Sequence, residues 1–420
     1  MRATRPKAYY GWYLSITLAV TETISWGIIY YAFTVFLTPM EHDLGWSRAE
    51  LTGGFSLMLL VAGMMAFPVG AWIDKHGARL LMTAGSIGAS LFVIAWAFVT
   101  DVTAYYLIWV GMGMCASAVL YEPAFAVIAQ WFHQRRGTAL AIITFAAGLA
   151  STIFLPLCDA LLQRFGWRTS VLILGLFLAL VTVPLHALVL RRRPADLGLQ
   201  LDGEPISAAP SRAPARALSF REALNGRVFW LLTLGFGLAS LSATAIRVHF
   251  IPFLIGGGID ASSAAFATGA IGIMQVVGRA IFAPLDRRFS SSIVMTGVFV
   301  LQAAALAFLL FGQSALVLGA FILVFGAAQG AMTLSRPAVL AELYGVSYYG
   351  RISSIMTIFL TLTSTGAPLA ASLIYDRFTS YQPVVWLVVV LSLASIGVVL
   401  LARRAMMAAI VTPALAESRL

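Results

Sequence analysis

Charged residues are scarce in this sequence. Only 10% of its 420 residues are Asp, Glu, Lys or Arg, whereas soluble domains average about 25%. Cysteine is nearly absent too, and because the two that occur, Cys115 and Cys158, fall inside apolar runs, neither a disulfide framework nor a metal site is indicated. The sequence also lacks G-x-S-x-G, H-E-x-x-H and nucleotide-loop motifs. These absences argue against a soluble fold, an enzyme, a cofactor and ATP hydrolysis.

Apolar residues make up 60% of the chain and recur in runs close to the length of about 20 residues that a helix needs to cross a bilayer. The runs lack the alternation of an outer-membrane strand, so helices are favoured over a barrel. The first run is too long for the apolar core of a signal peptide. The pattern predicts an all-α membrane protein with twelve transmembrane helices, at residues 12–36, 49–73, 79–100, 104–129, 137–161, 168–190, 229–254, 264–285, 291–311, 315–338, 351–374 and 384–402.

The basic residues predict the topology. With both termini inside, roughly twenty of the 27 Lys and Arg fall in cytoplasmic segments, as the positive-inside rule requires. The net charge of +10 therefore follows from topology and does not indicate a nucleic-acid partner. We expect a multi-pass protein of the cytoplasmic (inner) membrane that contacts the lipid bilayer and is a monomer.

A stretch rich in Pro, Ala and Arg divides the chain. Its loss of apolar character predicts a flexible cytoplasmic linker over residues 191–227. An N-terminal six-helix bundle, residues 1–190, precedes it. A C-terminal six-helix bundle with a short cytoplasmic tail, residues 228–420, follows it.

The two halves share sequence features at a constant spacing. Arg164-Phe165 returns 213 residues later as Arg377-Phe378, and Gly137 returns as Gly350 at the same spacing. Chance spacing in loops is the alternative to duplication. Duplication indicates two bundles related by pseudo-two-fold symmetry, with a solute path at their interface.

A short motif lies between the second and third runs. Residues 70–79 read G-A-W-I-D-K-H-G-A-R and resemble the loop signature of the major facilitator superfamily, G-x-x-x-D-[RK]-x-G-x-R. The resemblance implies that Gly70 allows close helix approach and that the Asp74 carboxylate lies near a helix N-terminus of the other half. Asp286 occupies the corresponding loop of the second half, where the loop glycine is missing. The residues expected to act in gating are Gly70, Asp74, Lys75, Gly77, Arg79, Arg136, Asp286 and Arg336.

Other segments resemble the bacterial branch of the monocarboxylate porter family. They are Tyr10-Gly11-Trp12, residues 131–137 (W-F-H-Q-R-R-G), residues 165–168 (F-G-W-R), residues 193–199 (R-P-A-D-L-G-L) and Gly278-Arg279. The resemblance implies a secondary active transporter that moves a small organic monocarboxylate by proton-coupled symport with alternating access.

Arg279 matches the arginine that this family is taken to use for the substrate carboxylate, whereas Gln275 stands where many eukaryotic members carry an aspartate. Residues 352–371 hold no cation, unlike oxalate-type carriers, so one carboxylate is expected. The expected substrate-binding residues are Arg279, Gln275, Tyr30, Tyr31 and His249. Aromatic packing is the alternative for the tyrosines, and simple hydrogen bonding is the alternative for the histidine.

Two acids lie well inside predicted spans. Glu22 is near the middle of the first span, and Glu122 precedes Pro123 in the fourth. A charged side chain inside a membrane is costly unless it faces a cavity or a partner, so both are proton-coupling candidates, with a static hydrogen-bonded role as the alternative. Export of a drug-like or metabolite solute against protons, or organic-anion exchange, are the alternative functions. Drug export is disfavoured because the fifth span lacks the G-x-x-x-G-P-x-x-G-G pattern.

Overall fold

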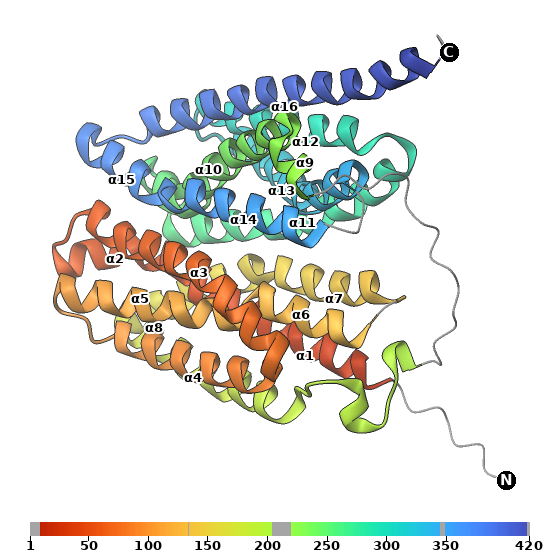
Figure 1. The fold of residues 1–420 in the computed structure, drawn as a ribbon. Helices are drawn as coiled ribbons and strands as arrows, with labels where there is room; N and C mark the ends of the chain where they lie inside the picture. The colour runs from red at the N-terminus through yellow and green to blue at the C-terminus, as the bar shows by residue number, and fades with distance from the viewer. Residues whose placement is uncertain (1–8, 133, 204–219, 345–348, 418–420) are drawn as a thin grey trace. The chain divides into compact units, whose positions relative to one another are not determined.

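The computed structural model describes residues 9–132, 134–203, 220–344 and 349–417, and all the regular secondary structure in these ranges is helical. The chain divides into two compact units (Figure 1). Unit 1 comprises Met1–Trp46 and Gly53–Pro210. Unit 2 comprises Ser47–Thr52 and Ser211–Leu420.

The helices of unit 1 run from red to yellow-green in Figure 1. Within this unit α4 packs on α5 and α8, and α1 packs on α7 and α8. Its elements are α1 (Tyr10–Ser25), the π-helix η1 (Trp26–Tyr31), α2 (Ala32–Leu44), α3 (Arg48–His76), α4 (Ala78–Trp96), α5 (Val102–Val119), α6 (Tyr121–Trp131), α7 (Arg136–Gly148), α8 (Ala150–Val189) and the 3-10 turns η2 (Pro194–Leu197) and η3 (Leu201–Gly203).

Unit 2 is built in the same way from long apolar helices. Helix α13 packs on α11 and α12, while α10 packs on α14 and α16. Its elements are α9 (Phe220–Asn225), α10 (Arg227–Gly256), α11 (Ala261–Arg288), α12 (Ser291–Phe308), the 3-10 turn η4 (Leu309–Phe311), α13 (Ala315–Tyr344), α14 (Tyr349–Thr365), α15 (Ala367–Phe378) and α16 (Gln382–Glu417).

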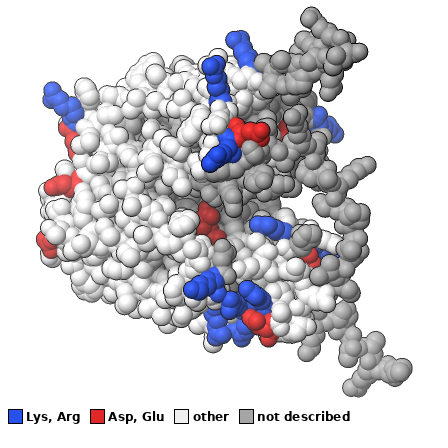
Figure 2. Space-filling view, in the orientation of Figure 1, with Lys and Arg blue, Asp and Glu red and all other residues white. Residues whose placement is uncertain are grey.

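The helices have the length and surface of membrane spans. Eleven helical segments of the described chain are long and apolar enough to cross a bilayer. The longest, Arg136–Val189, has 54 residues and turns at Gly166 (φ 72°, ψ 167°), so it supplies two spans. Large apolar side chains point outward, with Phe67 83% and Leu316 84% exposed. Most of the face in Figure 2 is uncharged. The prediction of an all-α protein with twelve membrane helices is confirmed.

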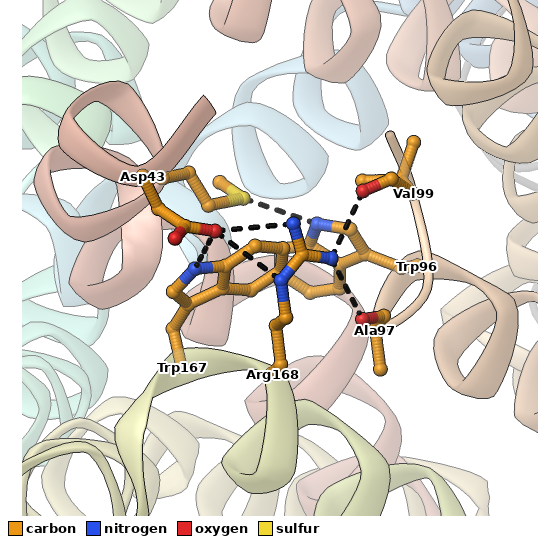
Figure 3. A network of polar contacts seen from close by, with 7 residues as sticks. Asp43, Trp96, Ala97, Val99, Trp167 and Arg168 are labelled. Carbon is orange, nitrogen blue, oxygen red and sulfur yellow. Dashed lines mark hydrogen bonds and ion pairs between the residues drawn. The ribbon is translucent and has the colours of Figure 1, made fainter. Parts of the chain in front are cut away.

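The F-G-W-R segment closes one end of unit 1 (Figure 3). The Arg168 guanidinium forms an ion pair with Asp43 at 3.1 Å and donates to the carbonyl oxygens of Ala97 and Val99 at 3.1 and 2.9 Å. The Trp167 indole donates to the same Asp43 oxygen at 3.1 Å. One arginine therefore ties the ends of the first and third spans to the turn at Gly166.

Several spans are interrupted. In the first, six residues form the π-helix η1, a rare element that is frequent at functional sites. In the fourth, α5 ends at Val119, and Leu120 is extended (φ −88°, ψ −165°). Pro123 accounts for this break, because a proline ring clashes with the carbonyl four residues earlier in a continuous helix. The fifth and eleventh spans break at Leu149 and Gly366.

The prediction that Asp74 and Asp286 lie in loops is wrong. Helix α3 continues to His76 and α11 continues to Arg288, so both aspartates belong to the last turns of helices. A helix can extend past the apolar part of its sequence because its polar last turn is solvated. The true stop after α3 is Gly77, whose left-handed backbone (φ 81°) favours glycine.

Candidate functional site

Glu22 is enclosed in the interior of unit 1. Its side chain is 0% exposed, one turn before the π-helix begins. Its Oε2 accepts a hydrogen bond from the Trp26 indole N–H at 3.1 Å. Its Oε1 has no hydrogen-bond partner in the described part of the chain. The described residues thus satisfy only one of the two carboxyl oxygens.

The Trp26 ring that donates to this carboxyl group belongs to an aromatic cluster. The Trp26 ring lies 5.1 Å from that of Tyr121 and 5.3 Å from that of Tyr30, and Tyr31 meets Tyr30 edge-on at 5.2 Å. Trp26, Tyr31 and Tyr121 are half-buried, whereas Tyr30 is buried. The interrupted first span and the interrupted fourth span therefore meet at aromatic side chains.

Glu122 directly follows Tyr121, a member of this cluster. It occupies the first turn of α6, directly after the break at Leu120, and is exposed. A carboxylate in a first helical turn is stabilised by the helix dipole. The two acids predicted from the sequence are therefore linked through the contact between Trp26 and Tyr121, with Glu22 buried and Glu122 exposed.

The π-helix is held against α8 by a glycine. A Cβ atom at Gly27 would collide with the Phe154 ring. Only the absence of a side chain lets η1 approach α8 this closely. The neighbourhood of Glu22 is therefore shaped by contacts between helices as well as by its own helix.

Arg279 lies inside unit 2, on α11, with its side chain 4% exposed. Gln275, one turn earlier, is half-buried. Helix α11 is pressed against α13: a Cβ at Gly278 would collide with the Ala327 carbonyl, and a Cβ at Gly330 would collide with that of Gln275. Backbone packing at these glycines sets the position of the arginine.

His249 takes part in a hydrogen-bond network of unit 2. Its Nε2 lies 2.9 Å from the Pro368 carbonyl and its Nδ1 lies 2.9 Å from the Tyr381 hydroxyl. A carbonyl only accepts, so in the neutral ring Nε2 carries the hydrogen and Nδ1 accepts from Tyr381. The Tyr381 oxygen also accepts from Arg48 at 2.7 Å, and Arg48 groups with unit 2. Both ring nitrogens are engaged, and only tertiary contacts reveal Tyr381 as a partner.

The loop motif binds the end of α8. Arg192 donates to the Lys75 carbonyl at 2.6 Å, and Arg79 donates from Nε to the Ala187 carbonyl at 2.8 Å. A Cβ at Gly77 would meet Arg192 at 2.7 Å. Lys75 and Arg79 are exposed. Lys75 takes part through its backbone carbonyl, and Arg79 takes part through its guanidinium. The motif therefore joins the end of α3 and the start of α4 to the end of α8 and the chain that follows it.

The other expected gating residues differ in their surroundings. A Cβ at Gly70 would meet no described atom within 4 Å. Arg136 is exposed at the start of α7, and Arg336 is half-buried in α13. The side chains of Asp74 and Asp286 lie outside what the structure describes.

Asp202 is a polar anchor that the sequence did not suggest. Its carboxylate accepts from the backbone N–H groups of Gln134 and Arg135 at 2.7 and 3.3 Å, and its side chain is 8% exposed. Burial, together with the Asp202 charge, raises the pKa of Tyr9 to about 12. Residues 191–203 therefore pack on unit 1, although the sequence predicts the start of a flexible linker there.

Comparison with known proteins adds the family. The sequence profile of the Major Facilitator Superfamily matches residues 18–257, more than half of the chain. The chain belongs to this superfamily. It is therefore a multi-pass membrane transporter and not an enzyme.

Several relatives of this transporter are named monocarboxylate transporters. Human monocarboxylate transporter 11 is 29% identical over 274 residues, 64% of this chain and 55% of that protein. The chain thus spans little more than half the length of that relative. Bovine monocarboxylate transporter 13 is 26% identical over 384 residues, covering 89% of this chain and 84% of that protein. The uncharacterized MFS-type transporter YcxA of Bacillus subtilis is 23% identical over 373 residues, 84% and 86% of the two chains.

Solved structures support the fold. A bacterial homolog of the human lysosomal transporter Spinster, solved in an inward-facing and unoccupied conformation, superposes with a TM-score of 0.75. The match covers 96% of this transporter and 98% of that chain at 16% identity. At this identity the likeness establishes the fold alone.

Proposed function

We propose that this transporter moves a small organic monocarboxylate across the cytoplasmic (inner) membrane by proton-coupled symport, with both termini in the cytoplasm. The observation that carries the proposal is the burial of the Arg279 guanidinium inside a span. A charged side chain in that position is costly and therefore marks a functional site. The names of the relatives support monocarboxylates as the substrate class.

Arg279 binds the substrate carboxylate. Its planar guanidinium offers paired N–H donors to a carboxylate, a geometry that lysine cannot reproduce. Gln275, one turn earlier on the same helix, offers an amide to a second polar group of the solute. Tyr30 and Tyr31 contribute an aromatic wall, and His249 contributes a ring whose present partners would be exchanged on binding.

Glu22 and Glu122 couple transport to protons. The enclosed Glu22 carboxyl is suited to hold a proton, and the exposed Glu122 is suited to exchange one with water. Gating uses the two cytoplasmic motif regions around Gly70, Asp74, Lys75, Gly77, Arg79 and Asp286, together with Arg136 and Arg336.

The first prediction concerns Arg279. In purified protein, Arg279→Lys weakens binding of short labelled monocarboxylates such as lactate and pyruvate at least about tenfold, equivalent to about 1.4 kcal/mol. Arg247→Lys is the matched control, because Arg247 is a half-buried span cation that donates to the Ala243 carbonyl of its own helix. A folded Arg279→Lys variant with full carboxylate affinity would contradict the assignment.

Transport itself is tested in proteoliposomes. A panel of labelled monocarboxylates and their neutral amides is offered with and without an imposed pH gradient. Symport predicts accumulation of the acids only when the gradient drives protons in the same direction. Accumulation driven against the proton flow would indicate the exporter alternative instead.

A further inference from the structure

We propose that Trp26 is a positioning residue for proton exchange at Glu22, and that the exchanged proton is carried on Glu22 Oε1. This inference rests on the proposed proton coupling and names the atom that takes the proton and the residue that controls it. Its basis is the single hydrogen bond that the enclosed carboxyl group receives.

The indole group decides which oxygen is protonated. A tryptophan N–H can only donate, so the Glu22 Oε2 that it contacts at 3.1 Å must accept in both protonation states. When Glu22 is neutral, its hydrogen therefore sits on Oε1. That oxygen is fully buried and has no partner among the described residues. Proton uptake converts the carboxylate and one H⁺ into the acid, with the new O–H bond on Oε1.

The surroundings make the ionised form depend on this one donor. Burying a carboxylate in an apolar interior is costly unless hydrogen bonds replace its water. The nearby hydroxyl of Thr21 donates instead to Leu18, and that of Thr23 donates to Ala19. Glu122, in the first turn of α6, is the acid that follows Tyr121, whose ring packs on that of Trp26. Release of the proton is therefore sensitive to any change at Trp26.

Trp26 is placed to transmit such a change. It is the first residue of the π-helix, and its ring packs on Tyr30 of η1 and Tyr121 of α6. The π-type bond from the Ala32 N–H to the Gly27 carbonyl closes this segment. A shift of η1 or of α6 moves the indole and alters its bond to Glu22. The proton affinity of Glu22 then follows the conformation of the two interrupted spans.

Infrared difference spectroscopy during a pH titration tests the inference without any solute. The full chain is purified and placed in lipid nanodiscs, and the carbonyl stretch of protonated carboxylic acids is followed. We expect one band that Glu22→Gln removes. In Trp26→Phe this band moves to higher frequency, because its carbonyl oxygen loses a donor. The proton concentration at the midpoint of its titration changes by about tenfold or more, which is the effect expected from the loss of one hydrogen bond to a charged group.

A matched variant separates this effect from a general loss of packing. Trp96→Phe removes another buried indole donor of unit 1, which contacts Met40 Sδ at 3.2 Å. It leaves the Glu22 band unchanged. Glu22→Asp shortens the side chain and draws the carboxyl group away from the indole. We expect it to shift the band frequency and the titration midpoint as Trp26→Phe does, so it replaces Trp26→Phe in the test if that variant does not fold.

Two results would overturn the inference: no titrating band lost in Glu22→Gln, or a Trp26→Phe band with the wild-type frequency and midpoint. The outcomes also separate it from the proposed substrate. If the Glu22 band depends on Trp26 but the protein takes up no carboxylate, the proposed substrate is rejected and the proposed proton site is supported. If carboxylate uptake is driven by protons but that band is absent, only the proposed proton site is rejected.

Discussion

Equivalent spans differ in helical regularity between the two units. In unit 1 the first span contains the π-helix η1 and the fourth breaks at Leu120, whereas their counterparts α10 and α13 in unit 2 run unbroken for 30 residues each. Proline does not explain the contrast by itself, because α10 and α13 each contain one and remain continuous. The fifth and eleventh spans, in contrast, both break.

This comparison separates a feature of the repeated fold from a feature of one unit. The break in the fifth span of each half is common to both and needs no special function. The breaks in the first and fourth spans occur in unit 1 alone within the described chain, and Glu22 and Glu122 lie beside them. Unit 2 instead carries Arg279 on an unbroken helix packed through glycines. We therefore expect proton-linked change in unit 1 and a rigidly placed cation in unit 2.

The strongest test of this difference between the units is to remove the acid beside the π-helix. Glu22→Gln keeps the shape of the side chain but cannot ionise, so we expect it to abolish uptake driven by a pH gradient in proteoliposomes. Asp159→Asn is the control, because Asp159 is a buried acid of α8 in the same unit and receives a bond from Gln163 at 3.4 Å. Undiminished gradient-driven uptake by Glu22→Gln, Glu122→Gln and the double variant would show that these acids are structural.

A second prediction compares the two kinds of interruption. Gly27→Ala forces a Cβ into the Phe154 ring, and overpacking of this kind costs about 1–3 kcal/mol. Gly366→Ala adds its Cβ where no described atom lies within 4 Å, so it should be tolerated. Thermal unfolding in detergent measures both. Equal melting temperatures would mean that η1 is not held by this contact.

The smallest effect is expected at the edge of unit 1. Asp202→Ala removes the acceptor of the Gln134 and Arg135 N–H groups, and because both residues are exposed and water can replace it, we expect a cost of about 0.5–1.5 kcal/mol. Its melting temperature should fall. Shortening residues 207–216, where composition predicts a linker, should leave it unchanged. If both changes are silent, the packing of residues 191–203 adds nothing to stability.

Much of the architecture was predictable from local sequence. The number of spans follows from the length of apolar runs, since a bilayer requires about 20 apolar residues per helix. The break before Glu122 also had a local signal in Pro123. Helix ends were less predictable: the last turns of α3 and α11 are polar and continue past the apolar stretch, which is why Asp74 and Asp286 were misplaced.

The sequence by itself determined that this protein is a helical membrane transporter, and it singled out Glu22, Glu122 and Arg279 as charges in apolar surroundings. The helices follow from the length of the apolar runs and the transporter from the loop motif, whereas the three residues follow from the cost of placing charge in a membrane. Only the tertiary structure decided that the Trp26 ring, whose indole donates to Glu22, packs on Tyr121 beside Glu122. It also revealed the π-helix, which lacks a proline signal and is packed against Phe154 of another helix. The contacts of Trp26 with Tyr121 and of Gly27 with Phe154 join residues that are distant in the sequence, so no local pattern encodes them.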